Sequence, residues 1–319
     1  MKSRSLITGI TGFAGSYLAE FLLNKNQEVY GLSNNTENLD NVLKIKNKIR
    51  LFKVDLLEKP KIEKIVEKIR PNYIFHLAAQ SLSPLSVAQP KQTFDINFIG
   101  TYNLLEAVRQ SKIDCVIQLA CSSEEYGLVY PNEVPIKEEN TLRPLTPYAV
   151  SKIAVDFLGY QYSKSYGLKI IRIRAFNHEG PRRGELFVTS AFARQIALIE
   201  KGLQEPVIKV GNLEAKRDFT DVRDMVRAYY LSVLKCKPGE VYNVCSGKAW
   251  EIKEVLDYLL SLSKVKGIRI KKDPKRMRPS DLPILLGDYS KFFTTTGWKP
   301  KINFKVTLRD TLNYWRERV

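Results

Sequence analysis

Short apolar runs alternate with amphipathic stretches along the first 175 residues of the chain. The apolar runs have the length of buried strands and lie at 4–8, 28–32, 51–56, 73–81, 113–120 and 169–175. Between them, apolar positions recur with helical spacing, as in residues 16–23 and 93–111. Strands that alternate with helices in this way predict an α/β fold, a doubly wound parallel sheet with helices on both faces.

A glycine-rich turn separates the first expected strand from the first expected helix. Residues 9–15 read Gly-Ile-Thr-Gly-Phe-Ala-Gly. A sharp turn without bulky side chains that opens a helix presents backbone N–H groups on which a pyrophosphate can rest. In this strand-turn-helix context the pattern predicts a dinucleotide site, and a plain surface turn is the less favoured alternative.

The end of the second expected strand bears on which dinucleotide binds. An acidic residue there would bind the ribose 2′-hydroxyl of NAD, and an arginine would accommodate the 2′-phosphate of NADP. The chain has Ser33, Asn34 and Asn35 at this place. Because these side chains can pair with either group, the residues themselves leave the choice open.

The stretch 143–152, Arg-Pro-Leu-Thr-Pro-Tyr-Ala-Val-Ser-Lys, is where we expect the chemistry. Pro147 suits the first turn of a helix, so Tyr148 and Lys152 share one helical face. A cation beside a phenol stabilises the phenolate, and we therefore expect the pKa of Tyr148 to be lowered toward neutrality. In isolation, a solvated surface pair is the favoured interpretation of this spacing.

Two further polar residues change that interpretation. Ser122 and Glu124 follow the apolar run 113–120, so they lie just past the C-terminal end of a strand, where open α/β sheets bind ligands. A hydroxyl there can hydrogen-bond the same substrate oxygen that Tyr148 addresses. Asn97, within an otherwise apolar helical face, either braces the active-site strand or is a satisfied core amide.

Composition and charge describe an ordinary folded protein with a basic surface. The chain has 319 residues, 44% hydrophobic content and a formal net charge of +17, which allows one large or two moderate domains. Its lysines interleave with apolar positions and accompany no nucleic-acid motif, so we expect solvated faces and no nucleic-acid partner. The sequence shows neither a membrane-length apolar run nor a secretory leader, which predicts a cytoplasmic protein without membrane association.

Cysteine and histidine usage argues against a metal site or a disulfide framework. The four cysteines include no Cys-x-x-Cys pair, and the two histidines are His76 and His178. We expect buried free thiols, no metal, and a structural role for His178.

The glycine-rich turn, Ser122, Glu124, Tyr148 and Lys152 together resemble the extended short-chain dehydrogenase/reductase family, also called the NAD-dependent epimerase/dehydratase family. The resemblance covers nearly the whole chain. It implies a Rossmann-type doubly wound parallel sheet in residues 1–176 and a smaller C-terminal α/β substrate-binding lobe in residues 177–319. Some segments of that lobe are expected to return to the first domain.

The resemblance also implies roles for individual residues. The implied catalytic residues are Ser122, Glu124, Tyr148 and Lys152. The implied cofactor-binding residues are Gly9, Thr11, Gly12, Phe13, Gly15, Asn34, Asp55, Leu56, Leu77, Ala78, Ala79, Tyr148 and Lys152. The implied substrate-binding residues are Ser81, Asn177, Val188, Arg217, Arg278 and Asp281. The cofactor implied is NADP in preference to NAD.

Within the family, the motifs point in two directions. Gln80, Ser81 and the segment 177–185 resemble GDP-mannose 4,6-dehydratases, whereas the short length and the segments 217–222 and 278–283 resemble GDP-4-keto-6-deoxymannose reductases. Ser122 and Ala191 stand where the dehydratases usually have Thr and Lys.

The resemblance narrowly ranks the dehydratase first. The reductase, or an enzyme with both activities, comes second, and a nucleotide-sensing protein without catalysis is the remote alternative. A GDP-sugar substrate and a homodimer or homotetramer are implied.

Overall fold

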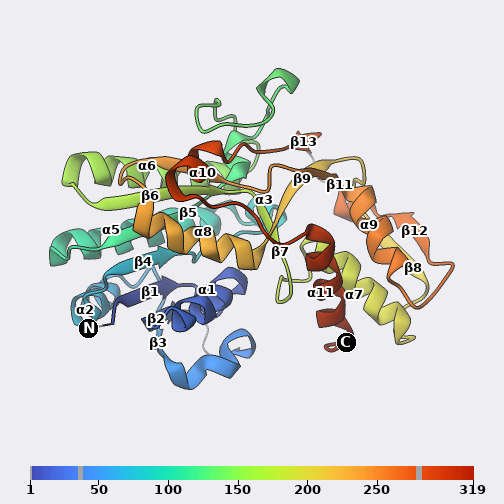
Figure 1. Cartoon of the computed structure of the whole chain (residues 1–319), viewed down its shortest axis with the longest axis horizontal. Helices are drawn as coiled ribbons and strands as arrows, with labels where there is room; N and C mark the ends of the chain where they lie inside the picture. The colour runs from blue at the N-terminus through green and yellow to red at the C-terminus, as the bar shows by residue number, and fades with distance from the viewer. Residues whose placement is uncertain (1, 35–38, 278–281) are drawn as a thin grey trace.

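The apolar runs form the strands of a seven-stranded sheet in the computed structural model, which describes residues 2–34, 39–277 and 282–319 (Figure 1). The strands are β1 (Arg4–Thr8), β2 (Glu28–Ser33), β3 (Ile49–Lys53), β4 (Tyr73–His76), β5 (Val116–Ser122), β6 (Lys169–Ala175) and β10 (Val241–Val244). Their order is β10-β6-β5-β4-β1-β2-β3, and each neighbouring pair is parallel. This order is that of a Rossmann-type doubly wound sheet extended by β10, which confirms the predicted fold class.

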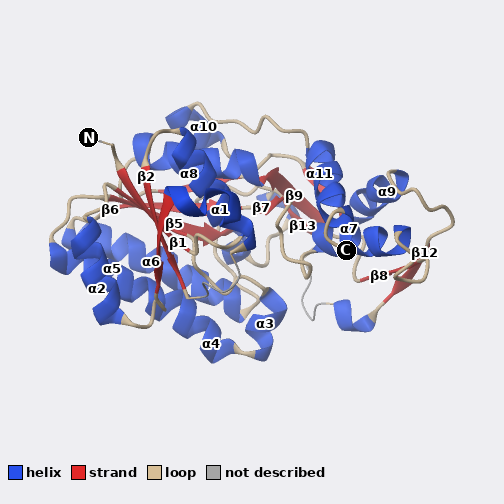
Figure 2. Cartoon of the chain, turned by 90° about the horizontal axis from the view of Figure 1, so that it is seen from below, coloured by secondary structure: helices blue, strands red, loops and turns tan. Residues whose placement is uncertain are grey.

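Helices cover both faces of this sheet (Figure 2). One face carries α1 (Phe13–Asn24), α8 (Val222–Lys235) and α10 (Ser290–Thr296), and the other carries α2 (Lys59–Ile69), α5 (Gly100–Ser111) and α6 (Pro147–Tyr166). Because successive strand residues point to opposite faces, Ile7 and Leu6 enter two different hydrophobic cores. Both side chains are fully buried, as expected for strands covered on both sides.

The later part of the chain builds a smaller lobe beside the carboxyl ends of the sheet strands (Figure 1). Its helices and strands are α7 (Val188–Glu200), α9 (Ile252–Ser261), α11 (Phe304–Arg316), β7 (Asn177–Glu179), β8 (Val207–Val210), β9 (Lys216–Asp221), β11 (Ala249–Glu251), β12 (Arg269–Lys272) and β13 (Ile284–Leu285). Phe219 and Phe304 stack with ring centroids 4.8 Å apart in its core. Between these segments, β10, α8 and α10 return to the large sheet.

Short helical segments complete the fold. They are α3 (Ser83–Ala88), α4 (Pro90–Phe94), a π-helical turn η2 (Asp95–Ile99), and the 3₁₀ turns η1 (Asp40–Lys48), η3 (Ser123–Tyr126), η4 (Pro131–Glu133) and η5 (Pro274–Arg276). Within the described residues, no helix combines the length and apolar character that crossing a bilayer requires. The four cysteines are buried and free, as predicted.

Two strands end earlier than their apolar runs predict. The run 73–81 stops being a strand after His76, because the N–H groups of Leu77 and Ala78 donate to the Thr8 hydroxyl at 3.1 Å. The run 51–56 stops after Lys53, and Asp55 accepts a hydrogen bond from the N–H of Leu57 in a turn. Both truncations leave polar loop backbone at the edge of the sheet where ligands bind.

Candidate active site

A cavity of about 1350 Å³ opens at the carboxyl ends of the sheet strands and is lined by residues of both the sheet and the smaller lobe. This volume exceeds that of ordinary small-molecule pockets, so it has room for a dinucleotide and a second ligand. The predicted site residues that line it are Gly9, Thr11, Gly12, Phe13, Gly15, Asn34, Asp55, Leu56, Leu77, Ala78, Ala79, Ser81, Ser122, Glu124, Tyr148, Lys152, Asn177, Val188 and Arg217. Arg278 and Asp281 lie outside the described residues.

The glycine-rich turn forms a cradle in which a Cβ atom would clash with neighbouring backbone. Gly9 has φ +70°, and a Cβ at Gly15 would lie 2.2 Å from the Gly9 carbonyl oxygen. Helix α1 begins directly after Gly12, which makes no side-chain cap. The backbone N–H groups of the first helical turn therefore face the cavity without a competing side chain, an arrangement that suits a diphosphate.

A buried histidine fixes the loop that follows β4. The Thr8 hydroxyl accepts from two backbone N–H groups, so its own proton goes to His76 Nδ1 at 2.8 Å. The other ring nitrogen, Nε2, lies 2.8 Å from the Thr101 hydroxyl. Burial, assisted by the Lys152 charge, lowers the pKa of His76 to about 3, so the ring is a neutral bridge between β1 and α5.

Asn97 braces the same loop from the other side. It lies in the π-helical turn, where its Oδ1 accepts from the Gln80 N–H at 2.8 Å and its Nδ2 donates to the Gln80 carbonyl at 3.1 Å. Nδ2 also donates to the Ser151 hydroxyl at 2.9 Å, and that hydroxyl donates to the Tyr148 carbonyl at 2.7 Å. Asn97 is therefore a satisfied core amide, and it braces the loop after β4 against α6 rather than the strand considered from the sequence.

Tyr148 and Lys152 lie where the helical spacing predicts. Thr146 caps α6 through a hydrogen bond from the Ala149 N–H at 3.1 Å, and Pro147 is the first helical residue. Both side chains are buried. Lys152 Nζ donates to the Ala120 carbonyl at 2.7 Å and lies 5.9 Å from the centroid of the Tyr148 ring.

The expected lowering of the Tyr148 pKa is wrong for this structure. Burial raises the pKa of Tyr148 above its usual value, and the nearby charge of Glu124 acts in the same direction. A hydrogen bond with Ser122 opposes this shift without compensating for it. Burial also lowers the pKa of Lys152. The sequence shows the neighbouring charge but not the desolvation, which is the larger effect here.

Glu124 is held by a serine that the sequence did not single out. Ser122 is the last residue of β5 and caps η3, and its hydroxyl accepts from the Glu124 N–H at 3.2 Å. The Ser83 hydroxyl reaches both Glu124 carboxylate oxygens, at 2.7 Å and 3.0 Å. Pro84 indicates that a helix starts near Ser83, but nothing local indicates a partner 41 residues away.

Arg183 and His178 also line the cavity wall. The Arg183 guanidinium lies 3.4 Å from the Phe187 ring centroid, and its charge acts on Tyr148. The His178 ring stacks on Phe13 with centroids 5.9 Å apart. Burial lowers the pKa of His178 to about 4, so this ring is neutral. Its stacking agrees with the structural role that we expected.

The smaller lobe contributes cations to the far part of the cavity. Arg217 lines the wall, and its Nη1 donates to the carbonyls of Lys216 at 2.9 Å and Leu282 at 2.7 Å. Lys209 and Arg276 line the same region. This group of cations suits a ligand that carries phosphate.

Comparisons with known proteins agree with this geometry. Residues 6–311 match the family model described as GDP-mannose 4,6 dehydratase. A GDP-6-deoxy-D-mannose reductase of Pseudomonas aeruginosa is 34% identical over 319 residues, covering 100% of this chain and 99% of the relative. A human GDP-mannose 4,6 dehydratase is 33% identical and covers 98% of this chain and 91% of the relative.

Solved structures show the same architecture. RMD from Pseudomonas aeruginosa, in complex with NADPH, superimposes with a TM-score of 0.86 at 33% identity and covers all of both chains. The UDP-glucose 4-epimerase of Thermus thermophilus, in complex with NAD, gives a TM-score of 0.88 at 31% identity, covering 99% of this chain and all of the other. The family-model match extends through the sheet, the Tyr148 helix and the smaller lobe, and the chain therefore belongs to the GDP-mannose 4,6-dehydratase family.

Proposed function

We propose that the chain is an NADPH-dependent reductase of GDP-4-keto-6-deoxymannose, which reduces the C4 ketone of this sugar nucleotide to an alcohol. The single observation that carries the proposal is the position of Tyr148. Its buried phenol lines the cavity together with Ser122, and Lys152 Nζ lies 5.9 Å from the centroid of its ring. A protonated phenol is the proton donor that ketone reduction requires.

The residues around the cradle fit the dinucleotide. A Cβ at Gly15 would fill the space above the Gly9 carbonyl, and Ala78 presents small backbone at the same wall. When bound, NADPH supplies the hydride. Tyr148 then donates its proton to O4, Ser122 holds the same oxygen by a hydrogen bond, and Lys152 stabilises the phenolate that remains. The lobe cations near Arg217 hold the diphosphate.

One comparison favours reduction over the dehydratase that the sequence ranked first. The GDP-6-deoxy-D-mannose reductase of Pseudomonas aeruginosa aligns with 100% of this chain and 99% of its own length, whereas the GDP-mannose 4,6-dehydratase of Vibrio cholerae aligns with 95% of this chain and 91% of its own length.

Dehydration of GDP-mannose is the second candidate, because one carboxylate lies near the reacting tyrosine. The charge of Glu124 raises the pKa of Tyr148, so the two groups are neighbours. In that reaction Tyr148 takes the O4 proton while the C4 hydride would pass to the bound oxidised cofactor. Glu124 then takes the C5 proton and delivers it to the C6 hydroxyl, which leaves as water. The same hydride would return to C6 and a solvent proton to C5, so the cofactor would be regenerated in each turnover.

Two substrates given to the same purified protein separate these functions. The reductase is expected to consume NADPH with GDP-4-keto-6-deoxymannose and to leave GDP-mannose unchanged. Formation of the 4-keto-6-deoxy product from GDP-mannose without added NADPH, with solvent deuterium at C5, would assign the dehydratase. Conversion of neither compound, nor of any other nucleotide-activated hexose, would leave the nucleotide-sensing alternative.

Glu124→Gln gives a second separation by chemistry. Ketone reduction needs no base at C5, so we expect kcat for reduction to fall by less than about tenfold. A dehydratase would lose roughly a hundredfold or more, the scale of a positioned general base. Steady-state rates with both substrates measure this difference, and a hundredfold loss of reduction would refute the minor role of Glu124.

Arg217→Ala tests the diphosphate site. Loss of a charge-assisted contact is expected to weaken GDP binding by about 2 kcal/mol, roughly thirtyfold. Isothermal titration of GDP into the NADPH-bound protein measures it. Arg194 on α7, which pairs with Glu185, is a matched surface control, and Arg194→Ala should bind GDP like the wild type. Unchanged affinity for GDP in Arg217→Ala would show that this arginine makes contacts within the lobe and does not bind the diphosphate.

We also infer that the protein forms a homodimer or homotetramer. Tyr102 on α5 and Phe157 and Tyr160 on α6 are large side chains that remain between 37% and 53% exposed in the single chain. Exposed aromatic side chains on adjacent helices favour an interface. Light scattering on the purified protein distinguishes a monomer from the proposed assemblies.

A further inference from the structure

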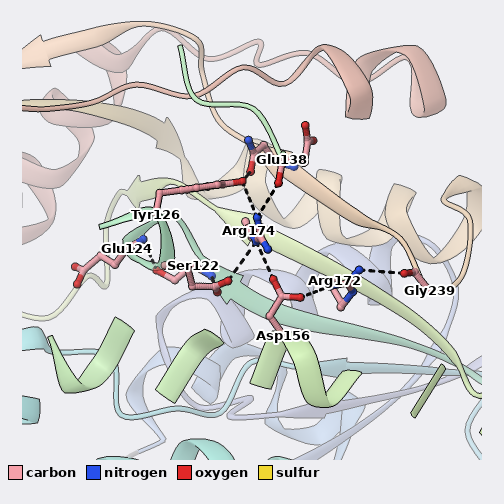
Figure 3. Close-up of polar contacts among 10 residues, drawn as sticks. Ser122, Glu124, Tyr126, Glu138, Asp156, Arg172, Arg174 and Gly239 are labelled. Carbon is pink, nitrogen blue, oxygen red and sulfur yellow. Dashed lines mark hydrogen bonds and ion pairs between the residues drawn. The ribbon is translucent and has the colours of Figure 1, made fainter. Parts of the chain in front are cut away.

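A buried polar cluster lies behind the active-site turn, outside the reaction described above. It consists of Glu125, Asp156, Arg172 and Arg174, which are all at most 6% exposed. Figure 3 shows Asp156 between the two arginines, while Glu124 points away from the cluster. The cluster links β6 and α6 to the turn that carries Ser122.

Asp156 is the anion that the two arginines neutralise. Its Oδ2 accepts from Arg174 Nε at 2.7 Å, and its Oδ1 accepts from Arg172 Nη1. Arg174 also donates to the Tyr126 hydroxyl at 3.1 Å, and Arg172 donates to the Gly239 carbonyl at 3.0 Å. These contacts fix both guanidinium groups and make Asp156 the favoured site for the negative charge.

Glu125 has a different set of partners. Its Oε1 accepts from the Ser122 N–H at 2.7 Å. Its Oε2 lies 3.2 Å from Arg174 Nε, but that N–H is directed at Asp156, and within the described structure Oε2 has no hydrogen bond of good geometry. A fully buried carboxylate with one unsatisfied oxygen is costly.

A proton on Glu125 removes that cost. Glu125 and Asp156 present carboxyl oxygens within 4.8 Å of each other, and two carboxyl groups in one buried site do not both ionise readily. A proton on Oε2 turns the unsatisfied acceptor into a donor toward Asp156. Burial and the Asp156 charge raise the pKa of Glu125 well above its usual value, which agrees with the geometry.

We propose that Glu125 is a positioning residue for the active-site turn: as a neutral carboxylic acid it accepts from the Ser122 N–H, donates to Asp156, and thereby holds Ser122 and Glu124 in place. Ser122 caps η3 in extended conformation, and its hydroxyl accepts from the Glu124 N–H. Without Glu125, the buried Ser122 N–H loses its acceptor. The role rests on the proposed function only in that Ser122 acts on the substrate oxygen.

Two substitutions separate a neutral acid from a carboxylate. Glu125→Gln keeps an oxygen acceptor for Ser122 and an N–H donor for Asp156, so we expect kcat within about threefold of the wild type. Glu125→Leu removes both bonds, and we expect kcat to fall on the order of a hundredfold, the cost of a reacting group displaced by about 1 Å. The dissociation constant for NADPH should stay unchanged in both variants.

Two measurements test the proposal without measuring enzymatic turnover. The infrared difference spectrum of wild type minus Glu125→Gln, in the NADPH-bound protein at neutral pH, should contain the carbonyl band of one protonated carboxylic acid. Hydrogen exchange in the peptide 119–127 should be faster in Glu125→Leu and unchanged in Glu125→Gln. If the wild type converts no GDP-sugar, the proposed function fails while these two measurements still test Glu125.

Other outcomes of these experiments would overturn the proposed role of Glu125. A Glu125→Gln variant as slow as Glu125→Leu would show that an ionised carboxylate is needed. Wild-type kcat and exchange in Glu125→Leu would remove the positioning role. If Glu125→Leu does not fold, the rate and exchange of Glu125→Gln and the infrared band decide, and either an inactive Gln variant or a missing band overturns the proposal.

Discussion

Tyr148→Phe is expected to lower kcat for ketone reduction by about 10²- to 10⁴-fold, the range for loss of a positioned proton donor. Phenylalanine fills the same buried space, so α6 and the bond from Thr146 to Ala149 should persist. NADPH affinity should change little, because the glycine cradle and the Ala78 loop are separate from this hydroxyl. Single-turnover oxidation of bound NADPH measures the chemical step directly.

A second tyrosine of the same helix provides the control. Tyr166 lies at the last position of α6 and is 51% exposed, so Tyr166→Phe should keep the wild-type rate. If Tyr148→Phe retained more than about a tenth of the wild-type rate, another group would be the proton donor, and the mechanism given for Tyr148 would fail.

Gly15→Ala is expected to weaken NADPH binding strongly. The new Cβ would lie 2.2 Å from the Gly9 carbonyl oxygen, and this atom belongs to the backbone of the cradle itself. Helix α1 must therefore move away from the turn, at a cost of roughly 1–3 kcal/mol. If the whole of this cost falls on NADPH binding, the dissociation constant for NADPH rises roughly 5- to 150-fold. Fluorescence titration with NADPH measures the change.

Gly202 is the matched glycine for this experiment. It has φ +71°, and a Cβ there would meet no atom within 4 Å. Gly202→Ala should therefore lower thermal stability by backbone strain alone and leave NADPH affinity at the wild-type value. Equal affinity in Gly15→Ala and the wild type would mean that the cradle tolerates the displacement and that its tight packing does not determine binding.

Much of the fold and most of the site were predictable because they depend on local patterns. Spacing within one or two elements predicts the strands from their apolar runs, the glycine cradle, and the shared helical face of Tyr148 and Lys152. Ser83 escaped prediction because its partner Glu124 is distant in sequence. The direction of the Tyr148 pKa escaped because desolvation depends on what the whole chain packs around the phenol.

The different roles of Glu124 and Glu125 could not be predicted from the sequence either. The sequence presents two adjacent glutamates, and their roles differ because η3 turns Glu124 toward Ser83 and Glu125 toward Ser122 and Arg174. Adjacent residues of one short turn point in different directions, so the pair cannot be assigned from order alone. Only the packing of β6 and α6 against the turn separates the two carboxyl groups.

The return of β10, α8 and α10 to the large sheet limits how such proteins can be recombined. Because β10 pairs with β6, the segment that builds the smaller lobe also supplies an edge strand of the large sheet. A chimera that exchanges everything after residue 176 with a relative would replace that strand and two covering helices together with the lobe. Exchange of the smaller lobe between relatives therefore requires several short grafts, around residues 177–221 and 249–285, rather than one contiguous segment.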